Sequence, residues 1–100
     1  MAERTSKIVR TERVEVVDSD GRVRVVIGTI DAGTGMVGVT VLDSDGRERG
    51  FIVTDEGGAE AGVSALGNNL ACIRATDDGD VTAFLADPKG NVLDWWDNAA

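Results

Sequence analysis

One segment of the chain occurs twice, almost unchanged, 25 residues apart. Residues 16–24 read VVDSDGRVR, and residues 41–49 read VLDSDGRER. The correspondence continues beyond these segments, because Ile27 aligns with Ile52. Apolar residues followed by a cluster of aspartate, serine and glycine are typical of a strand that ends in a tight turn. A repeat of this length therefore restricts the chain to a fold in which one β-unit recurs.

The Asp-x-x-Gly sequence at the centre of each copy has the chemistry of a type I turn. Aspartate at the first position accepts a hydrogen bond from backbone further along the turn, and glycine at the fourth position adopts a positive φ. A looser third copy, DPKG at residues 87–90, adds a proline at the second position, which that position favours. We predict the same turn at residues 18–21, 43–46 and 87–90. The glycine should form a bulge that lets the twisted strands continue as a hairpin.

The segments between turns read as strands. Turn signals recur every ten to thirteen residues, and residues 37–41 alternate valine with glycine and threonine, which is the period of a strand. The sequence predicts an all-β fold, a repetitive antiparallel hairpin meander of about seven or eight short strands with β-prism or β-solenoid character. We assign residues 13–97 to this domain and residues 1–12 to an extended N-terminal arm. The further turn signals are residues 31–33, 55–57, 67–69 and 77–79.

The apolar residues are small, and some occupy both sides of a strand. Of the 42% hydrophobic residues, 14 are valine and 11 alanine, and only four residues are aromatic. Each small side chain buries little area, at about 25 cal/mol per Å². Phe51 precedes Ile52, and Trp95 precedes Trp96, so apolar groups face both ways. These residues predict either a thin repetitive core or burial that is shared between subunits.

Acidic residues outnumber basic ones, 18 to 10, giving a net charge of −8. Nucleic-acid affinity comes largely from lysine and arginine, so we expect no nucleic-acid partner. No stretch approaches the roughly 18 apolar residues of a membrane span, so we expect no membrane partner. The expected location is the cytoplasm, or a particle assembled there.

The residue types of acid–base and nucleophilic catalysis are scarce. The chain has no histidine and no tyrosine, and its single cysteine, Cys72, lies in the apolar run 70–73, where we expect an inert, buried thiol. The glycine-rich segments 33–35 and 57–58 lack the lysine and hydroxyl of a phosphate loop. We predict a protein that is not an enzyme and has no catalytic residue, no metal site and no cofactor.

The acidic turns allow one alternative to pure turn chemistry. Clustered carboxylates suit a calcium loop, but such a loop continues to a glutamate at position 12, where this chain has Thr29 and Thr54. The third copy places Lys89 at a ligand position. We therefore favour a turn role. The alternative is a small ligand-binding module that uses these loops for a divalent ion or a carbohydrate.

Five residues are the candidates for partner binding. Tryptophan is enriched at binding hot spots, and of two adjacent strand residues one can close a core while the other meets a partner. The arginines that follow the turns should pair with carboxylates across neighbouring strands, or form a row that recognises an acidic partner. The candidates are Trp95, Trp96, Phe51, Arg24 and Arg49.

The unit Asp-x-x-Gly-x-x-Arg, at residues 18–24 and 43–49, resembles repeats of bacterial proteins of uncharacterised function and of phage tail-fibre-like segments. The match covers residues 14–54, with a degenerate continuation to residue 96, where Leu93 replaces the arginine. Fibre-like segments commonly form intertwined β-structured homotrimers, so the resemblance implies a trimer. The predicted function is a non-enzymatic structural or interaction module that self-assembles through valine-rich strand faces and the C-terminal tryptophans.

Overall fold

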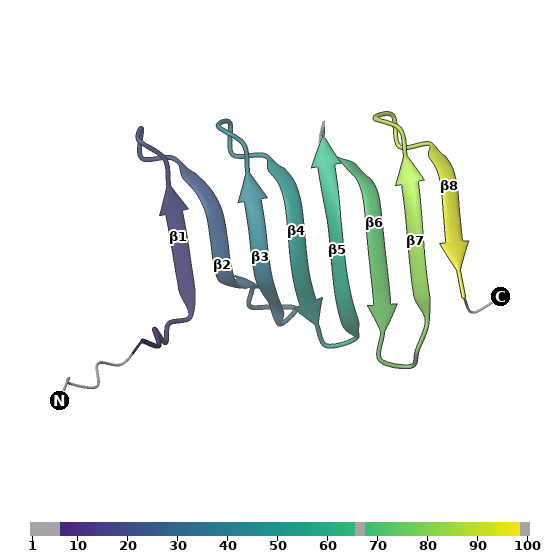
Figure 1. Ribbon diagram of the computed structural model, residues 1–100, viewed down its shortest axis with the longest axis horizontal. Coiled ribbons are helices and arrows are strands. Elements are labelled where there is room, and N and C mark those ends of the chain that lie inside the picture. Colours follow the sequence, from purple (N-terminus) through teal and green to yellow (C-terminus); the bar gives the residue numbers. More distant parts are fainter. Residues whose placement is uncertain (1–6, 66–67, 99–100) are drawn as a thin grey trace.

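The computed structural model describes residues 7–65 and 68–98, and its strands form one sheet. Each strand is antiparallel to the next in sequence, so spatial order follows chain order from β1 to β8 (Figure 1). The predicted all-β hairpin meander is thereby confirmed. The strands are β1 (Arg13–Val17), β2 (Val23–Asp31), β3 (Met36–Leu42), β4 (Glu48–Asp55), β5 (Gly58–Ala65), β6 (Asn68–Thr76), β7 (Val81–Ala86) and β8 (Val92–Asp97).

The three Asp-x-x-Gly turns have one geometry. The glycine amide donates to the aspartate carbonyl at 2.9, 3.0 and 2.9 Å in residues 18–21, 43–46 and 87–90, and the glycine φ angles are +82°, +83° and +90°. The aspartate Oδ1 accepts two further amide hydrogens in each turn, at 2.9–3.1 Å. The predicted turn is therefore confirmed in all three copies.

A bulge follows the turn in the four hairpins β1–β2, β3–β4, β5–β6 and β7–β8. The register shifts by one residue at the start of β2, β4, β6 and β8, and leaves one extra residue in each strand. The hairpin β5–β6 has the bulge although its sequence lacks the Asp-x-x-Gly turn. The structural repeat is thus a two-strand hairpin that occurs four times. The extra residues are Arg24, Arg49, Leu70 and Leu93.

The sheet is a single layer in the part of the chain that the structure describes. Strands contact only their neighbours in sequence, and no other element packs on them. The accessible surface is 7228 Å², against about 5400 Å² for a compact monomer of 10.5 kDa. The radius of gyration is 16.9 Å, against about 13 Å expected for 100 residues. One chain therefore leaves much more surface in water than a compact domain does.

The two faces of the sheet differ sharply. One, the apolar face, carries the cross-strand row Val14, Ile27, Val39, Ile52, Ala61, Ile73, Ala83 and Trp96, together with the residues two positions along each strand. The other, the mixed face, carries Phe51, Phe84 and Trp95 among charged and polar side chains. All five buried residues lie on the mixed face: Val26, Thr40, Val53, Ser64 and Cys72.

Candidate functional site

The apolar face is exposed across all eight strands. Ile52 is 67% exposed and Ile73 59%, although both lie in the middle of a strand, and Trp96 near the end of β8 is 57% exposed. Isolated apolar residues are common on protein surfaces, but a continuous apolar face of this extent marks an interaction site. The other large exposed residues of the face are Val14, Val16, Ile27, Val37, Val41, Val63 and Leu85.

Large and small residues alternate on this face from β4 to β8. The central row reads Ile52, Ala61, Ile73, Ala83, Trp96, and the adjacent row reads Gly50, Val63, Ala71, Leu85, Asp94. Each strand therefore pairs one large residue with one small residue two positions away, and the order reverses from strand to strand. We call this arrangement the checkerboard.

Two shallow grooves lie where the small residues of the checkerboard stand. One, of about 340 Å³, lies over Ala71 and Ala83 and is flanked by Leu85 and Trp96. The other, of about 300 Å³, lies over Ala61 and Ala71. Both are open to solvent on the apolar face, so the face offers hollows as well as projections.

The mixed face, in contrast, holds ion pairs between side chains of neighbouring strands. Arg74 on β6 contacts Asp55 at 3.3 Å and Glu60 at 3.3 Å, which bridges three strands. The Cys72 thiol donates to Glu60 at 2.9 Å. Burial raises the pKa of Cys72 to about 12, and the hydrogen bond and negative charge of Glu60 add to this. The thiol is therefore buried, as predicted from its apolar neighbours, and its surroundings disfavour the thiolate.

A small pocket on the mixed face is lined by Phe51, Glu48 and Glu60 around the buried hydroxyl of Thr40. Thr40 Oγ1 has no hydrogen-bond partner in the described residues. The pocket volume is about 160 Å³, whereas organic ligands occupy pockets of about 300–1000 Å³. It suits a few water molecules rather than an organic ligand.

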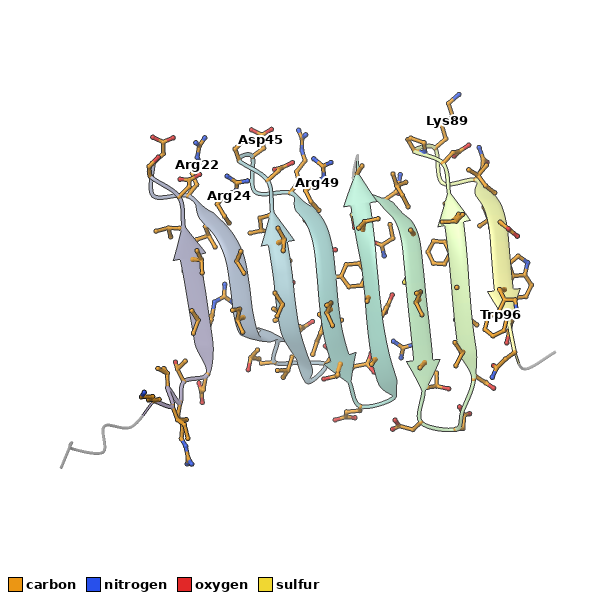
Figure 2. All side chains as sticks on the ribbon, viewed as in Figure 1. Arg22, Arg24, Asp45, Arg49, Lys89 and Trp96 are labelled. Carbon is orange, nitrogen blue, oxygen red and sulfur yellow. The ribbon has the colours of Figure 1, made fainter. Side chains whose placement is uncertain are left out.

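The two loop edges of the sheet differ in charge. The edge with the β1–β2, β3–β4 and β7–β8 turns, here the arginine edge, carries Asp18, Asp20, Asp43, Asp45 and Asp87 beside Arg22, Arg24, Arg47, Arg49 and Lys89 (Figure 2). With Glu48, which begins β4, this edge has six acidic and five basic side chains, so its charges nearly cancel. The opposite edge, here the acidic edge, carries Asp31, Asp55, Glu56, Asp77, Asp78 and Asp80 in its loops. The negative charge of the chain is thus concentrated on one edge.

The arginines of the arginine edge bond within their own hairpin turn and to the next strand. Arg24 lies 3.4 Å from Asp18, and Arg49 lies 3.6 Å from Asp43. The predicted pairing with carboxylates is therefore confirmed, but the carboxylates lie in the turn that follows the preceding strand rather than on the strand itself. On the next strand, each arginine donates from Nε to a backbone carbonyl. Arg24 donates to Leu42 at 2.9 Å, and Arg49 donates to Ser64 at 3.0 Å.

The turn carboxylates are engaged by the turn itself. The amide of Arg47 holds the pKa of Asp43 below its ordinary value, with further support from the amide of Asp45. The pKa of Asp87 is lowered in the same way, by hydrogen bonds from the side chain and the backbone amide of Asn91. Residues 7–65 and 68–98 contain no group of three or more carboxylate or thiol side chains placed to hold a metal ion.

The five candidates for partner binding lie in three separate places. Trp96 is on the apolar face, Trp95 and Phe51 are on the mixed face, and Arg24 and Arg49 are on the arginine edge. Neither tryptophan closes a core, because Trp95 is 63% exposed and Trp96 57%. The sequence reasoning missed the checkerboard residues of β4–β7. The alternation of isoleucine, leucine and valine with alanine and glycine at every second position was the signal that could have revealed them.

Comparison with known protein families, curated protein sequences and solved structures finds no match to this chain. In the described part of the chain, no helix is long and apolar enough to cross a membrane.

Proposed function

We propose that this protein is a non-enzymatic structural or interaction module that binds copies of itself through its apolar face. The observation that supports the proposal is the exposed apolar face, continuous from Val14 on β1 to Trp96 on β8. Exposed apolar area of this extent is a large free-energy cost in water, at about 25 cal/mol per Å². Covering the face removes that cost.

The size of the face supports a specific protein interface. Eight strands about 4.8 Å apart and six residues of about 3.4 Å each give an area of about 750 Å². Stable interfaces bury about 800 Å² per partner, and those of homodimers are the more apolar class. The face therefore has the size and composition of one side of a homo-oligomer interface.

The exposed apolar face does not by itself fix how many chains associate. The resemblance of the repeat to fibre-like segments implies three copies, arranged as a prism with the apolar faces inward. The trimer remains a prediction that native mass tests, because a trimer has three times the chain mass of 10.5 kDa.

The experiment is a native mass measurement on the wild-type chain and on Ile52→Lys. Ile52 is 67% exposed, so lysine there is solvated in the monomer and should leave the sheet folded, but it places a charge in the interface. We expect an oligomer for the wild type and a folded monomer for Ile52→Lys. The matched control, Ser44→Lys, adds the same charge in a turn and should remain oligomeric. A wild-type monomer at micromolar concentration would overturn the proposal.

A second candidate is a ligand-binding module, and one observation favours it. The Trp95 indole is 63% exposed on the mixed face, where it could stack on a sugar ring. Tryptophan fluorescence in the presence of a glycan panel tests this candidate, and an unchanged spectrum would remove it.

A further inference from the structure

We infer that the partner of the apolar face is a single second copy, packed face to face about a twofold axis that runs across the strands. In this arrangement each strand crosses its own copy, and the strands of the two sheets run in opposite directions. The inference rests on the proposed function and adds to it the number of copies, their orientation and the residues that set the register.

The checkerboard is self-complementary under this operation. An axis between the two checkerboard rows places Ile52 over Gly50 of the second copy, and Ile73 over Ala71. The same axis places Leu85 over Ala83, Val63 over Ala61 and Trp96 over Asp94. Every large residue from β4 to β7 thus meets a glycine or an alanine, and Trp96 on the outer strand β8 meets Asp94. Packed sheets lie about 10 Å apart and are filled best when large and small side chains interdigitate.

The register is specified only in this half of the face. On β1–β3 both rows consist of valine and isoleucine, with Val14 and Val16 on β1 and Val39 and Val41 on β3. These strands offer uniform apolar area and accept several registers. The grooves over Ala61, Ala71 and Ala83 are the hollows into which the large residues of the second copy fit.

The distribution of charge favours the same orientation. Running the strands in opposite directions places the acidic edge of each copy beside the arginine edge of the other. Running them in the same direction would bring two acidic edges together, each with six loop carboxylates, and like charges at an interface are unfavourable. Shape and charge therefore select one orientation independently.

The strand edges argue against the main alternative, side-by-side growth of the sheet. The outer strand β1 carries Arg13 and Glu15, and the outer strand β8 carries Asp94 and Asp97. Charged residues on outer strands discourage pairing with another chain. A threefold assembly would also set each face against two neighbours, so no strand would meet its own copy.

The first test exchanges a projection and a hollow within one strand. Ile73→Ala removes a projection and Ala71→Leu fills the hollow opposite it, so each should weaken association at least about tenfold. The double variant restores the fit with the positions exchanged, because residue 71 of each copy faces residue 73 of the other. We expect the double variant to associate within a few-fold of the wild type. If the double variant instead lost as much association affinity as the two single variants lose together, the inference would be overturned.

The second test uses cross-linking and does not depend on packing. In a Cys72→Ser background, Val14→Cys should cross-link to itself through a short bis-maleimide, because the two copies of residue 14 lie within about 12 Å of each other. Val37→Cys, near the acidic edge, should not, because its copies are about 22 Å apart. In a pair whose strands run in the same direction, the two copies of residue 14 are about 34 Å apart and stay unlinked.

The outcomes separate the inference from the proposed function. A wild-type monomer overturns both. A trimer leaves self-association intact and overturns the twofold pair. A mass of twice 10.5 kDa without a cross-link at residue 14 overturns the orientation alone.

Discussion

The ring of Phe51 lies across the mixed face from Gly62, so close that a Cβ on residue 62 would stand 2.9 Å from Phe51 Cζ and 2.5 Å from the Ala71 carbonyl oxygen. Gly62→Ala should therefore lower the free energy of unfolding by about 1–3 kcal/mol through overpacking. Urea denaturation at fixed protein concentration measures this. Gly57→Ala, in the β4–β5 loop, is the matched control, since the nearest atom to a Cβ there is Arg74 Nη2 at 3.6 Å. Equal stability of the two variants would contradict the prediction.

Acid should destabilise the fold through its turns. The amide of Arg47 lowers the pKa of Asp43, and the Asn91 side chain lowers that of Asp87, both from an ordinary value of 3.8. A carboxylate with a lowered folded-state pKa stabilises the fold fully above 3.8, and this stability is lost as the pH falls below 3.8 through the folded-state value. Urea midpoints between pH 7 and 2.5 should show this loss. Asp43→Asn keeps the acceptor oxygen but does not titrate, so its urea midpoint should depend less on pH than that of the wild type. An unchanged pH dependence in this variant would contradict the prediction.

Arg49→Lys tests whether this arginine serves the fold or a partner. Its Nε donates to the Ser64 carbonyl on the next strand at 3.0 Å, and lysine lacks the planar guanidinium that makes this bond. We expect a loss of about 0.5–1 kcal/mol in unfolding free energy and unchanged self-association. The Arg47 guanidinium lies 3.8 Å from the Asp45 carboxylate, so Arg47→Lys should lower the free energy of unfolding by less than Arg49→Lys does. If Arg49→Lys abolished association at unchanged stability, Arg49 would be a contact residue.

The two tryptophans should report on assembly in opposite ways. Trp95→Phe leaves Trp96 on the apolar face, and its emission should move to shorter wavelength as rising protein concentration drives association. Trp96→Phe leaves Trp95 on the mixed face, and its emission should stay constant. The same response from both variants would contradict burial of one face alone.

The Cys72 thiol should resist modification in the folded protein. With a pKa of about 12, the thiolate is about one part in ten thousand at pH 8. Iodoacetamide should therefore label Cys72 in urea much faster than in buffer. Since the folded-state pKa is raised from 9.0, stability should also fall as the pH rises above 9. Labelling at equal rates with and without urea would contradict a buried thiol.

Local chemistry could be predicted from the sequence. The turn at residues 43–46 is set by hydrogen bonds that span at most five residues, from Asp43 to the amide of Arg47. The strand count and the antiparallel meander follow from the spacing of such turns. The β2–β3 loop lacks the Asp-x-x-Gly motif, and its geometry was predicted less well. The turn was expected at residues 31–33, whereas the glycine with a positive φ is Gly35.

Cross-strand relationships could not be predicted. Which residues share a row depends on register shifts in five of the seven strand pairs. The pairing of Ala61 with Ile73, for example, depends on the extra residue Leu70 and not on alternation in the local sequence. The partners of Arg24 and Arg49 depend on side-chain reach across the bulge, which alternation alone does not encode. The aromatic residues of the sequence predict Phe51 as a partner-binding residue, whereas the exposed apolar face consists mainly of aliphatic residues such as Ile52.

Because each strand touches only its neighbours in sequence, the sheet has no fixed length. Duplicating or deleting one hairpin of about 25 residues would leave the remaining contacts unchanged. It would enlarge or shrink the apolar face by about 190 Å² at a time, the area of two strands. Recombination between repeats thus offers a route to graded binding strength, in which the affinity of the assembly is set by how many hairpins the gene encodes.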